Sequence, residues 1–245
     1  MRLALLSDIH ANKEAFEAVL TDLEQHGIDQ VVFLGDVVGY GPDPEWCVDT
    51  LELLVKEGAL ALRGNHDRST PAPNSLNPAA RKIIDWTLNR LNARQRMFLA
   101  DLPYQIALGD VLCVHASADQ PQQWQPVCDS ARAAASFAAT PARVILCGHV
   151  HRPALYSLDL SAKINQHAFA PRTALPLLTS RRWLGVIGSV GQARDGSGCA
   201  SYAILDQAQN SLSYRQVSYD SLTTADKIRA AALPEAFARR LISGI

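Results

Sequence analysis

Residues 31–39 read VVFLGDVVG, an apolar run that is interrupted by Gly-Asp. Its four apolar residues, Val31 to Leu34, have the length and composition of a buried strand. Gly35 then permits a tight turn, and Asp36 follows directly beyond the strand end. Ligands of open α/β sheets bind beside the carboxyl ends of the strands, so Asp36 is a candidate site residue.

The sequence on both sides of this stretch alternates between strands and helices. Residues 2–6 and 59–62 are further short apolar runs, and residues 13–25 and 45–57 have the apolar spacing of helices. Strand, helix, strand, helix, strand in this order is typical of a sheet whose parallel strands are joined by crossover helices.

The later elements are predicted from the same patterns. Helices are expected at 79–101, 130–138 and 223–243, a hairpin at 105–108 and 111–114, and a strand at 143–147. Strand-like runs beyond residue 151 are expected to form a second, more antiparallel sheet, at 154–159, 183–187, 200–205 and 212–217. We predict a loop at 68–78 and an irregular, lid-like segment at about 161–182. We expect one domain over residues 1–245, with a helical lid-like segment at about 70–103.

Composition and charge exclude several classes of protein. The chain has 245 residues, is 48% hydrophobic and carries a formal net charge of −1, so no global basic field favours duplex nucleic acid or an anionic membrane. No run approaches the roughly 18 apolar residues of a membrane span, and no signal peptide is recognisable. Five scattered cysteines without a CxxC pair indicate free thiols in a reducing compartment. We therefore expect a cytoplasmic protein.

Polar residues follow five of the predicted strands, and they are rich in histidine. They are Asp8 with His10, Asp36, Asn65 with His66 and Asp67, His115, and His149 with His151. Five of the seven histidines come within a few residues of an apolar strand. Histidine with aspartate and asparagine suits divalent transition metals such as Mn, Fe, Zn or Ni. Cysteine is absent from these positions, which argues against a structural zinc site.

Two metal ions need a shared anionic ligand to lie about 3.5–4 Å apart. Asp36 stands in the middle of the series and is the candidate for this bridge. A water or hydroxide between the ions would be the nucleophile, since the metals lower its pKa and polarise phosphoryl oxygens.

The whole pattern D-x-H, G-D-x-x-G, G-N-H-D, H, G-H-x-H resembles the calcineurin-like metallophosphoesterase superfamily, in particular its small bacterial and archaeal phosphodiesterases and phosphatases. The motifs lie within residues 1–151, and the resemblance extends more loosely to about residue 206. It implies an α/β fold, a four-layer α/β/β/α sandwich of two mixed sheets flanked by helices.

The resemblance also implies a role for each motif residue. Ligands of a first ion would be Asp8, His10 and His151. Ligands of a second ion would be Asn65, His115 and His149, with Asp36 between the ions. His66 would contact the phosphate and protonate the leaving oxygen as a general acid. Asp67 would orient His66 and raise its pKa through a carboxylate–imidazole hydrogen bond.

We predict hydrolysis of a small phosphate ester by two divalent ions, with Mn²⁺ the first choice and Fe, Zn or Ni the alternatives. A phosphodiesterase is favoured, and nucleotides are among the candidate substrates. A phosphomonoesterase or a protein Ser/Thr phosphatase could use the same site. A DNA nuclease would need an extended basic surface, and the net charge of −1 argues against this alternative. A non-catalytic metal-binding interaction module is the alternative outside the enzymes. Arg194 could contact phosphate, and the oligomeric state is left open.

Overall fold

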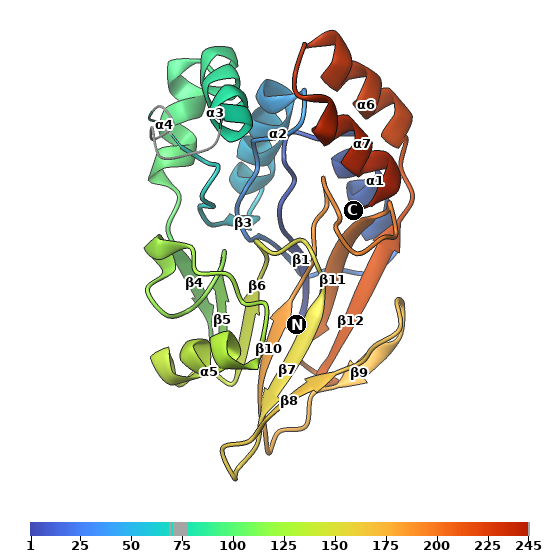
Figure 1. Ribbon diagram of the computed structural model, residues 1–245. Coiled ribbons are helices and arrows are strands. Elements are labelled where there is room, and N and C mark those ends of the chain that lie inside the picture. Colours follow the sequence, from blue (N-terminus) through green and yellow to red (C-terminus); the bar gives the residue numbers. More distant parts are fainter. Residues whose placement is uncertain (69, 71–77, 245) are drawn as a thin grey trace.

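The computed structural model describes residues 1–68, 70 and 78–244, and within them two six-stranded sheets lie face to face between outer helices (Figure 1). Each sheet contains both parallel and antiparallel pairs. One apolar cluster fills the space between the sheets, and others join each sheet to its own helices. The predicted four-layer α/β/β/α sandwich of two mixed sheets is confirmed.

The first sheet has the strand order β3-β2-β1-β11-β12-β9. Its strands are β1 (Arg2–Leu6), β2 (Gln30–Phe33), β3 (Leu60–Ala61), β9 (Ala174–Pro176), β11 (Ala200–Asp206) and β12 (Ser211–Val217). β1, β2 and β3 run parallel, as the strand–helix–strand pattern predicts, and the other pairs are antiparallel.

The second sheet has the order β4-β5-β6-β10-β7-β8. Its strands are β4 (Gln105–Leu108), β5 (Val111–Val114), β6 (Val144–Cys147), β7 (Ala154–Leu158), β8 (Ile164–His167) and β10 (Arg182–Val186). β5, β6 and β10 are parallel, and β4 with β5 forms the predicted hairpin.

Helices cover the outer faces of both sheets. α1 (Lys13–Leu23) and α2 (Pro44–Lys56) share an apolar cluster with the first sheet, and α5 (Ser130–Ala139) shares one with the second. The remaining helices are α3 (Pro78–Arg90), α4 (Ala93–Asp101), α6 (Ser221–Ala230) and α7 (Glu235–Ser243), and they gather at one end of the molecule in Figure 1. No helix of the described residues is long and apolar enough to cross a membrane.

β1 shows why its sequence is apolar without interruption. Leu3 and Leu5 belong to the cluster between the sheets, whereas Ala4 and Leu6 face the cluster of α1 and α2. Successive side chains of a strand point to opposite faces, so a strand covered on both sides needs apolar residues at every position. The apolar run at the N-terminus therefore reflects burial from two sides.

The expectation that the strands after residue 151 form a sheet of their own is wrong. β7, β8 and β10 complete the second sheet, while β9, β11 and β12 complete the first. β11 lies beside β1, with Ala203 opposite Leu5 in the register. Local sequence pattern identifies a strand but not its partner, because pairing depends on which faces are buried together.

The expectation of an irregular, lid-like segment at about 161–182 is also wrong. It contains β8, which pairs with β7, and β9, which pairs with β12. Both strands are short and lie at sheet edges, where mixed and half-exposed residues replace an apolar run. Such edge strands lack the hydrophobic signal by which strands are recognised.

Two of the expected helices are each divided in two. Residues 79–101 form α3 and α4, because Asn92 begins α4 with a capping box that it shares with Gln95. Residues 223–243 form α6 and α7, with Pro234 at the start of α7. The loop expected at 68–78 lies largely outside the described residues.

The cysteines are free, as expected. Cys47, Cys113 and Cys147 are buried, whereas Cys199 is half-buried and Cys128 is exposed. Burial raises the pKa of the Cys113 thiol to about 12, so this buried thiol stays protonated and inert at neutral pH.

The segment between β10 and β11 crosses the loop that follows β1. The amide of Val190 donates to the carbonyl of Ser7, and the amide of Gly191 donates to the carbonyl of Asp8, each at 2.9 Å. A Cβ atom on Gly191 would lie 1.8 Å from the carbonyl oxygen of Ile9. Only glycine permits so close an approach of two backbones.

Replacing Gly191 by Ala is expected to lower the free energy of unfolding by about 3 kcal/mol, because the clash is with backbone that cannot move alone. The matched control is Gly109→Ala, in the hairpin turn, where the added Cβ meets nothing within 4 Å. There the left-handed backbone alone costs about 1 kcal/mol. Urea unfolding of both variants measures the difference, and equal losses would contradict this account of the crossing.

Candidate metal centre

Strand ends from both sheets meet at one site. β1, β2 and β3 of the first sheet and β5 and β6 of the second end there, and the polar residues singled out in the sequence follow these strands. The amide of Asp8 donates to the carbonyl of Gly35 at 3.0 Å, and that of Gly148 donates to the carbonyl of His115 at 2.9 Å. The hydrogen bonding between strands thus continues into the loops that carry the site.

Five of the seven predicted metal ligands have a left-handed backbone conformation. Their φ angles are 56° at Asp8, 49° at His10, 55° at Asp36, 67° at His149 and 60° at His151. Non-glycine residues adopt this conformation rarely, and it costs of order 1–3 kcal/mol for each residue. Such strain persists only where the surrounding structure holds it, and it is concentrated at functional sites.

One group of side chains consists of Asp8, His10 and His151. The Nε2 atoms of the two histidines lie 3.0 Å apart. Oδ1 of Asp8 lies 3.6 Å from Nε2 of His10 and 3.3 Å from Nε2 of His151. This oxygen is buried and has no hydrogen-bond partner among the described residues. The three ligand atoms are close enough to hold one metal ion.

A second group consists of Asp36, His115 and His149, with Asn65 beside it. Nε2 of His115 lies 3.3 Å from Oδ2 of Asp36 and 3.2 Å from Nδ1 of His149. Oδ1 of Asn65 lies 3.1 Å from the same nitrogen of His115. The first three residues are also close enough to hold one metal ion.

Asp36 joins the two groups. Its Oδ2 atom, 3.3 Å from His115 of the second group, lies 3.8 Å from Nε2 of His10 in the first. Its other oxygen, Oδ1, accepts a hydrogen bond from the amide of His66 at 2.7 Å. The carboxylate is therefore oriented by the backbone and presents one oxygen to both groups.

Backbone carbonyl groups orient three of the imidazole rings. Nδ1 hydrogen-bonds a carbonyl oxygen in the pairs His10–Val38, His151–Gln192 and His115–Leu34, at 3.1, 2.7 and 2.7 Å. A carbonyl oxygen only accepts, so each Nδ1 carries the ring proton. In a neutral ring Nε2 then presents a lone pair to its group, which is the arrangement of metal-ligating histidines.

The buried charges of the site favour cations. Burial alone would raise the pKa of Asp36, but the charges of His115 and His66 hold it well below its usual range. Burial would likewise lower the pKa of His115, but the Asp36 carboxylate raises it to about 9. In the first group burial lowers the pKa of His151 to about 4, so the ring is neutral beside the ionised Asp8. Buried carboxylates need nearby positive charge, and this nitrogen and oxygen donor set fits divalent transition metals.

Asp67 does not contact the His66 ring, so the predicted carboxylate–imidazole hydrogen bond is wrong. Its carboxylate instead accepts backbone amides of Asp36, Val37, Val38 and Gly64, at 2.8, 2.8, 3.3 and 2.9 Å. Nδ1 of His66 is buried and has no hydrogen-bond partner among the described residues. Four backbone amides of tight loops, rather than the His66 ring, donate to this carboxylate, because a buried amide without an acceptor costs free energy. Asp67 thus joins the loops after β2 and β3.

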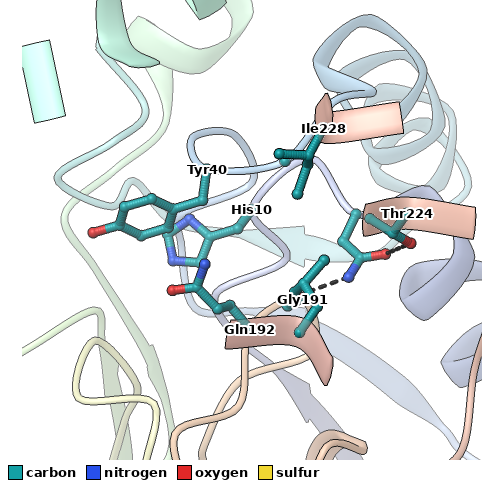
Figure 2. Close-up of a pocket in the computed structure, with 9 residues that line it drawn as sticks. His10, Tyr40, Gly191, Gln192, Thr224 and Ile228 are labelled. Atoms are coloured by element: carbon teal, nitrogen blue, oxygen red, sulfur yellow. Dashed lines mark hydrogen bonds between the residues drawn. The ribbon is translucent and has the colours of Figure 1, made fainter. Parts of the chain in front are cut away.

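The two groups open onto a cleft of about 290 Å³. His66 lines it together with residues that have no motif signal, namely Tyr40, Pro126, Cys128, Val150 and Arg194. The Tyr40 ring lies 4.5 Å from His10 and 4.6 Å from His66, between ring centroids. Figure 2 shows Tyr40 beside His10, with Gly191 and Gln192 next to them.

Asn12 is a supporting residue that the sequence interpretation missed. It is buried, its Oδ1 accepts from the amide of Ala15 at 3.1 Å as the N-cap of α1, and its Nδ2 donates to the carbonyl of Gly191 at 2.8 Å. The hydroxyl of Thr224 on α6 also donates to Asn12, at 3.1 Å (Figure 2). An asparagine directly before a helical pattern indicates an N-cap. No pattern in the sequence indicates the contact of Asn12 with α6.

Asp67→Asn is expected to lower the free energy of unfolding by about 2–3 kcal/mol. The side-chain amide nitrogen of asparagine is a donor, so it cannot accept the backbone amides that donate to the carboxylate oxygen it replaces. Burial and the charge of Asp36 raise the pKa of Asp67 to about 6, so the comparison belongs at pH 8, where the carboxylate is ionised. Asp226→Asn, at a side chain 77% exposed, is the control and should change the stability by less than about 1 kcal/mol. Denaturant unfolding that shows equal stability for the two variants would refute the role of Asp67.

The chain is similar to known proteins over most of its length. Residues 1–210 match the model of the calcineurin-like phosphoesterase superfamily domain. An uncharacterized protein of Methanocaldococcus jannaschii is 32% identical over 249 residues, which cover 99% of this chain and 98% of that protein.

Solved structures share the whole architecture. A metallophosphoesterase from Sphaerobacter thermophilus superposes with a TM-score of 0.88 at 35% identity, covering 100% of both chains. A hypothetical protein from Pyrococcus horikoshii has the same fold, with a TM-score of 0.81 at 20% identity over 100% of this chain and 98% of that one. The family match and the 32% identical relative, each spanning most of the chain, show that this protein belongs to the calcineurin-like phosphoesterase superfamily.

Proposed function

We propose that this protein hydrolyses a small phosphate ester with two divalent transition-metal ions, and that its preferred substrate is a phosphodiester. The observation that carries the proposal is the pair of buried ligand groups that share one oxygen of Asp36. The superfamily consists of dimetal-dependent phosphoesterases, and this donor set fits such a centre.

The two groups, together with Asn65 beside His115, support the ligand assignment. Asp8, His10 and His151 would hold one ion, Asn65, His115 and His149 would hold the other, and Asp36 would serve both. When bound, two such ions activate the attacking water and neutralise charge on the phosphoryl oxygens. Nitrogen and carboxylate or amide oxygen donors accept several divalent metals, and Mn²⁺ is our first choice.

His66 is the proposed general acid. Its ring lines the cleft, is fixed between His10 and Tyr40, and takes part in neither ligand group. Burial lowers the pKa of His66 to about 3, so the ring is neutral at pH 7 without substrate. A bound phosphate anion places negative charge beside the ring and raises its pKa. His66 then donates its proton to the leaving oxygen as the P–O bond breaks.

The cleft suits a small ester. Its volume of about 290 Å³ lies at the lower end of the range for small-molecule sites. Arg194 also lines a second hollow, and we propose that a second substituent on the phosphorus extends toward it. We favour the diester for this reason, with a nucleotide as one candidate, over a monoester or a phosphorylated protein. We further propose that residues 1–245 act as one domain in the cytoplasm.

Metal removal should abolish turnover, and single metals should restore it. Chelator-treated protein is assayed with p-nitrophenyl phosphate and bis-p-nitrophenyl phosphate after addition of Mn²⁺, Ni²⁺, Zn²⁺ or Mg²⁺ singly. We expect Mn²⁺ to restore the highest rate and kcat/KM to be greater for the diester. A higher kcat/KM for the monoester would contradict the preference for a phosphodiester and indicate a phosphatase. Full activity of verified metal-free protein would contradict the proposal.

His66→Asn is expected to lower kcat about a hundredfold or more while both ions remain bound, because a general acid is lost and no ligand is removed. The control is His26→Asn, on a ring at the end of α1 that pairs with Asp22 and lies outside the cleft. Metal content by mass spectrometry accompanies the kinetics. Loss of an ion from His66→Asn would make His66 a ligand, and retained turnover would favour a non-catalytic role for the ring.

A further inference from the structure

Arg194 stands between the cleft of the metal centre and a second hollow. It lines the cleft together with His66, His149 and His151. It also lines the adjoining hollow of about 440 Å³, together with Arg152 and Pro153. Arg194 therefore lines both spaces, and its carbonyl oxygen lies beside Arg152.

The Arg194 side chain is held in place without a carboxylate partner. Its guanidinium carbon lies 5.8 Å from the centroid of the Tyr40 ring, and Nη2 donates to Oε1 of Gln192 at 3.2 Å. Nε is buried and has no hydrogen-bond partner among the described residues. A positioned guanidinium with an unused buried donor is prepared to bind an anion, since arginine matches the oxygens of a phosphate with two parallel donors.

Arg152 extends the positive charge into the second hollow. Its Nε donates to the carbonyl oxygen of Arg194 at 2.6 Å, which ties the two residues together. The ion pairs found among the described residues include neither arginine. Asp195 also lines the hollow, but its carboxylate accepts from Ser197 and Gln216.

We propose that Arg194 and Arg152 form an anion subsite for a second phosphoryl group of the substrate. The preferred substrate is then a nucleotide-sized ester that carries one phosphoryl group at the metal centre and another in the adjoining hollow. This inference rests on the proposed hydrolysis, because it assumes that the scissile phosphorus lies between the two ligand groups. It goes further by requiring that the substrate carry two phosphoryl groups.

The test compares two esters that differ by one phosphoryl group. Thymidine 5′-(p-nitrophenyl phosphate) is assayed with and without a 3′-phosphate, in the Mn²⁺-loaded protein. We expect the 3′-phosphate to raise kcat/KM about tenfold in the wild type. In Arg194→Gln the loss of kcat/KM should be about tenfold greater for the doubly phosphorylated ester than for the other, and Arg152→Gln should show a smaller loss of the same kind.

Arg172→Gln is the control, because it removes one exposed arginine between β8 and β9 and should leave the ratio of the two esters within twofold of the wild type. Equal losses for both esters in Arg194→Gln would overturn the subsite and place Arg194 on the scissile phosphate. If the wild type showed no preference between the two esters, the anion subsite would be overturned as well. Turnover of either ester would still support the proposed hydrolysis.

Binding measured by calorimetry separates the two proposals. Thymidine 3′,5′-bisphosphate and thymidine 5′-monophosphate are titrated into the metal-loaded wild type and Arg194→Gln. We expect the bisphosphate to bind about tenfold more tightly than the monophosphate, and Arg194→Gln to reduce this ratio to about two. The same binding result without turnover of either ester would support the subsite and overturn the proposed hydrolysis. Equal affinities in the wild type would contradict the subsite.

Discussion

Asp8 and Asp36 place their carboxylates where almost no water reaches them, and each uses one oxygen to accept a backbone amide. The remaining oxygens, Oδ1 of Asp8 and Oδ2 of Asp36, lie 3.3 to 3.8 Å from imidazole Nε2 atoms. The Nε2 atoms of His10 and His151 lie 3.0 Å apart. Buried charge of one sign is unfavourable unless charge of the other sign lies beside it. The surrounding backbone accepts left-handed conformations at five ligand positions to bring these groups together. The structure around the site therefore supports two ligand groups, each of which is close enough to hold one metal ion.

That support comes from distant parts of the chain. Asp67 joins the loops after β2 and β3 through four backbone amides, and the segment around Gly191 holds the loop after β1. On the C-terminal side, Thr224 of α6 bonds to Asn12, and Phe237 of α7 packs on Tyr40 with ring centroids 5.1 Å apart. The final two helices lie beyond the 210 residues that match the family model, yet they contact residues that line or support the cleft. They therefore help to fix the shape of the cleft.

The sequence was most informative where one local pattern determines the outcome. Apolar runs that end in Gly-Asp or Gly-Asn predicted strand ends. The rule that ligands bind beside the carboxyl ends of strands predicted that Asp36 and His115 would meet, although β2 and β5 belong to different sheets. The partner strand of β1 and the edge strands β8 and β9 were not predictable, because pairing is a property of the folded sheets. Asp67 shows the limit for the site. The family resemblance implied one hydrogen bond to His66, whereas the carboxylate accepts four backbone amides of the tight loops. The cleft wall at Cys128 carries no motif and follows only from the packed structure.

The number of metal ions bound per chain shows whether both ligand groups are occupied. The chelated protein is saturated with Mn²⁺, freed of excess metal by gel filtration and analysed by mass spectrometry for metal per chain. We expect two ions per chain in the wild type and fewer than two when His10 or His149 is replaced by Ala, since each belongs to a different ligand group. A wild-type protein that binds no ion or a single ion under saturating conditions would contradict a site built for two cations.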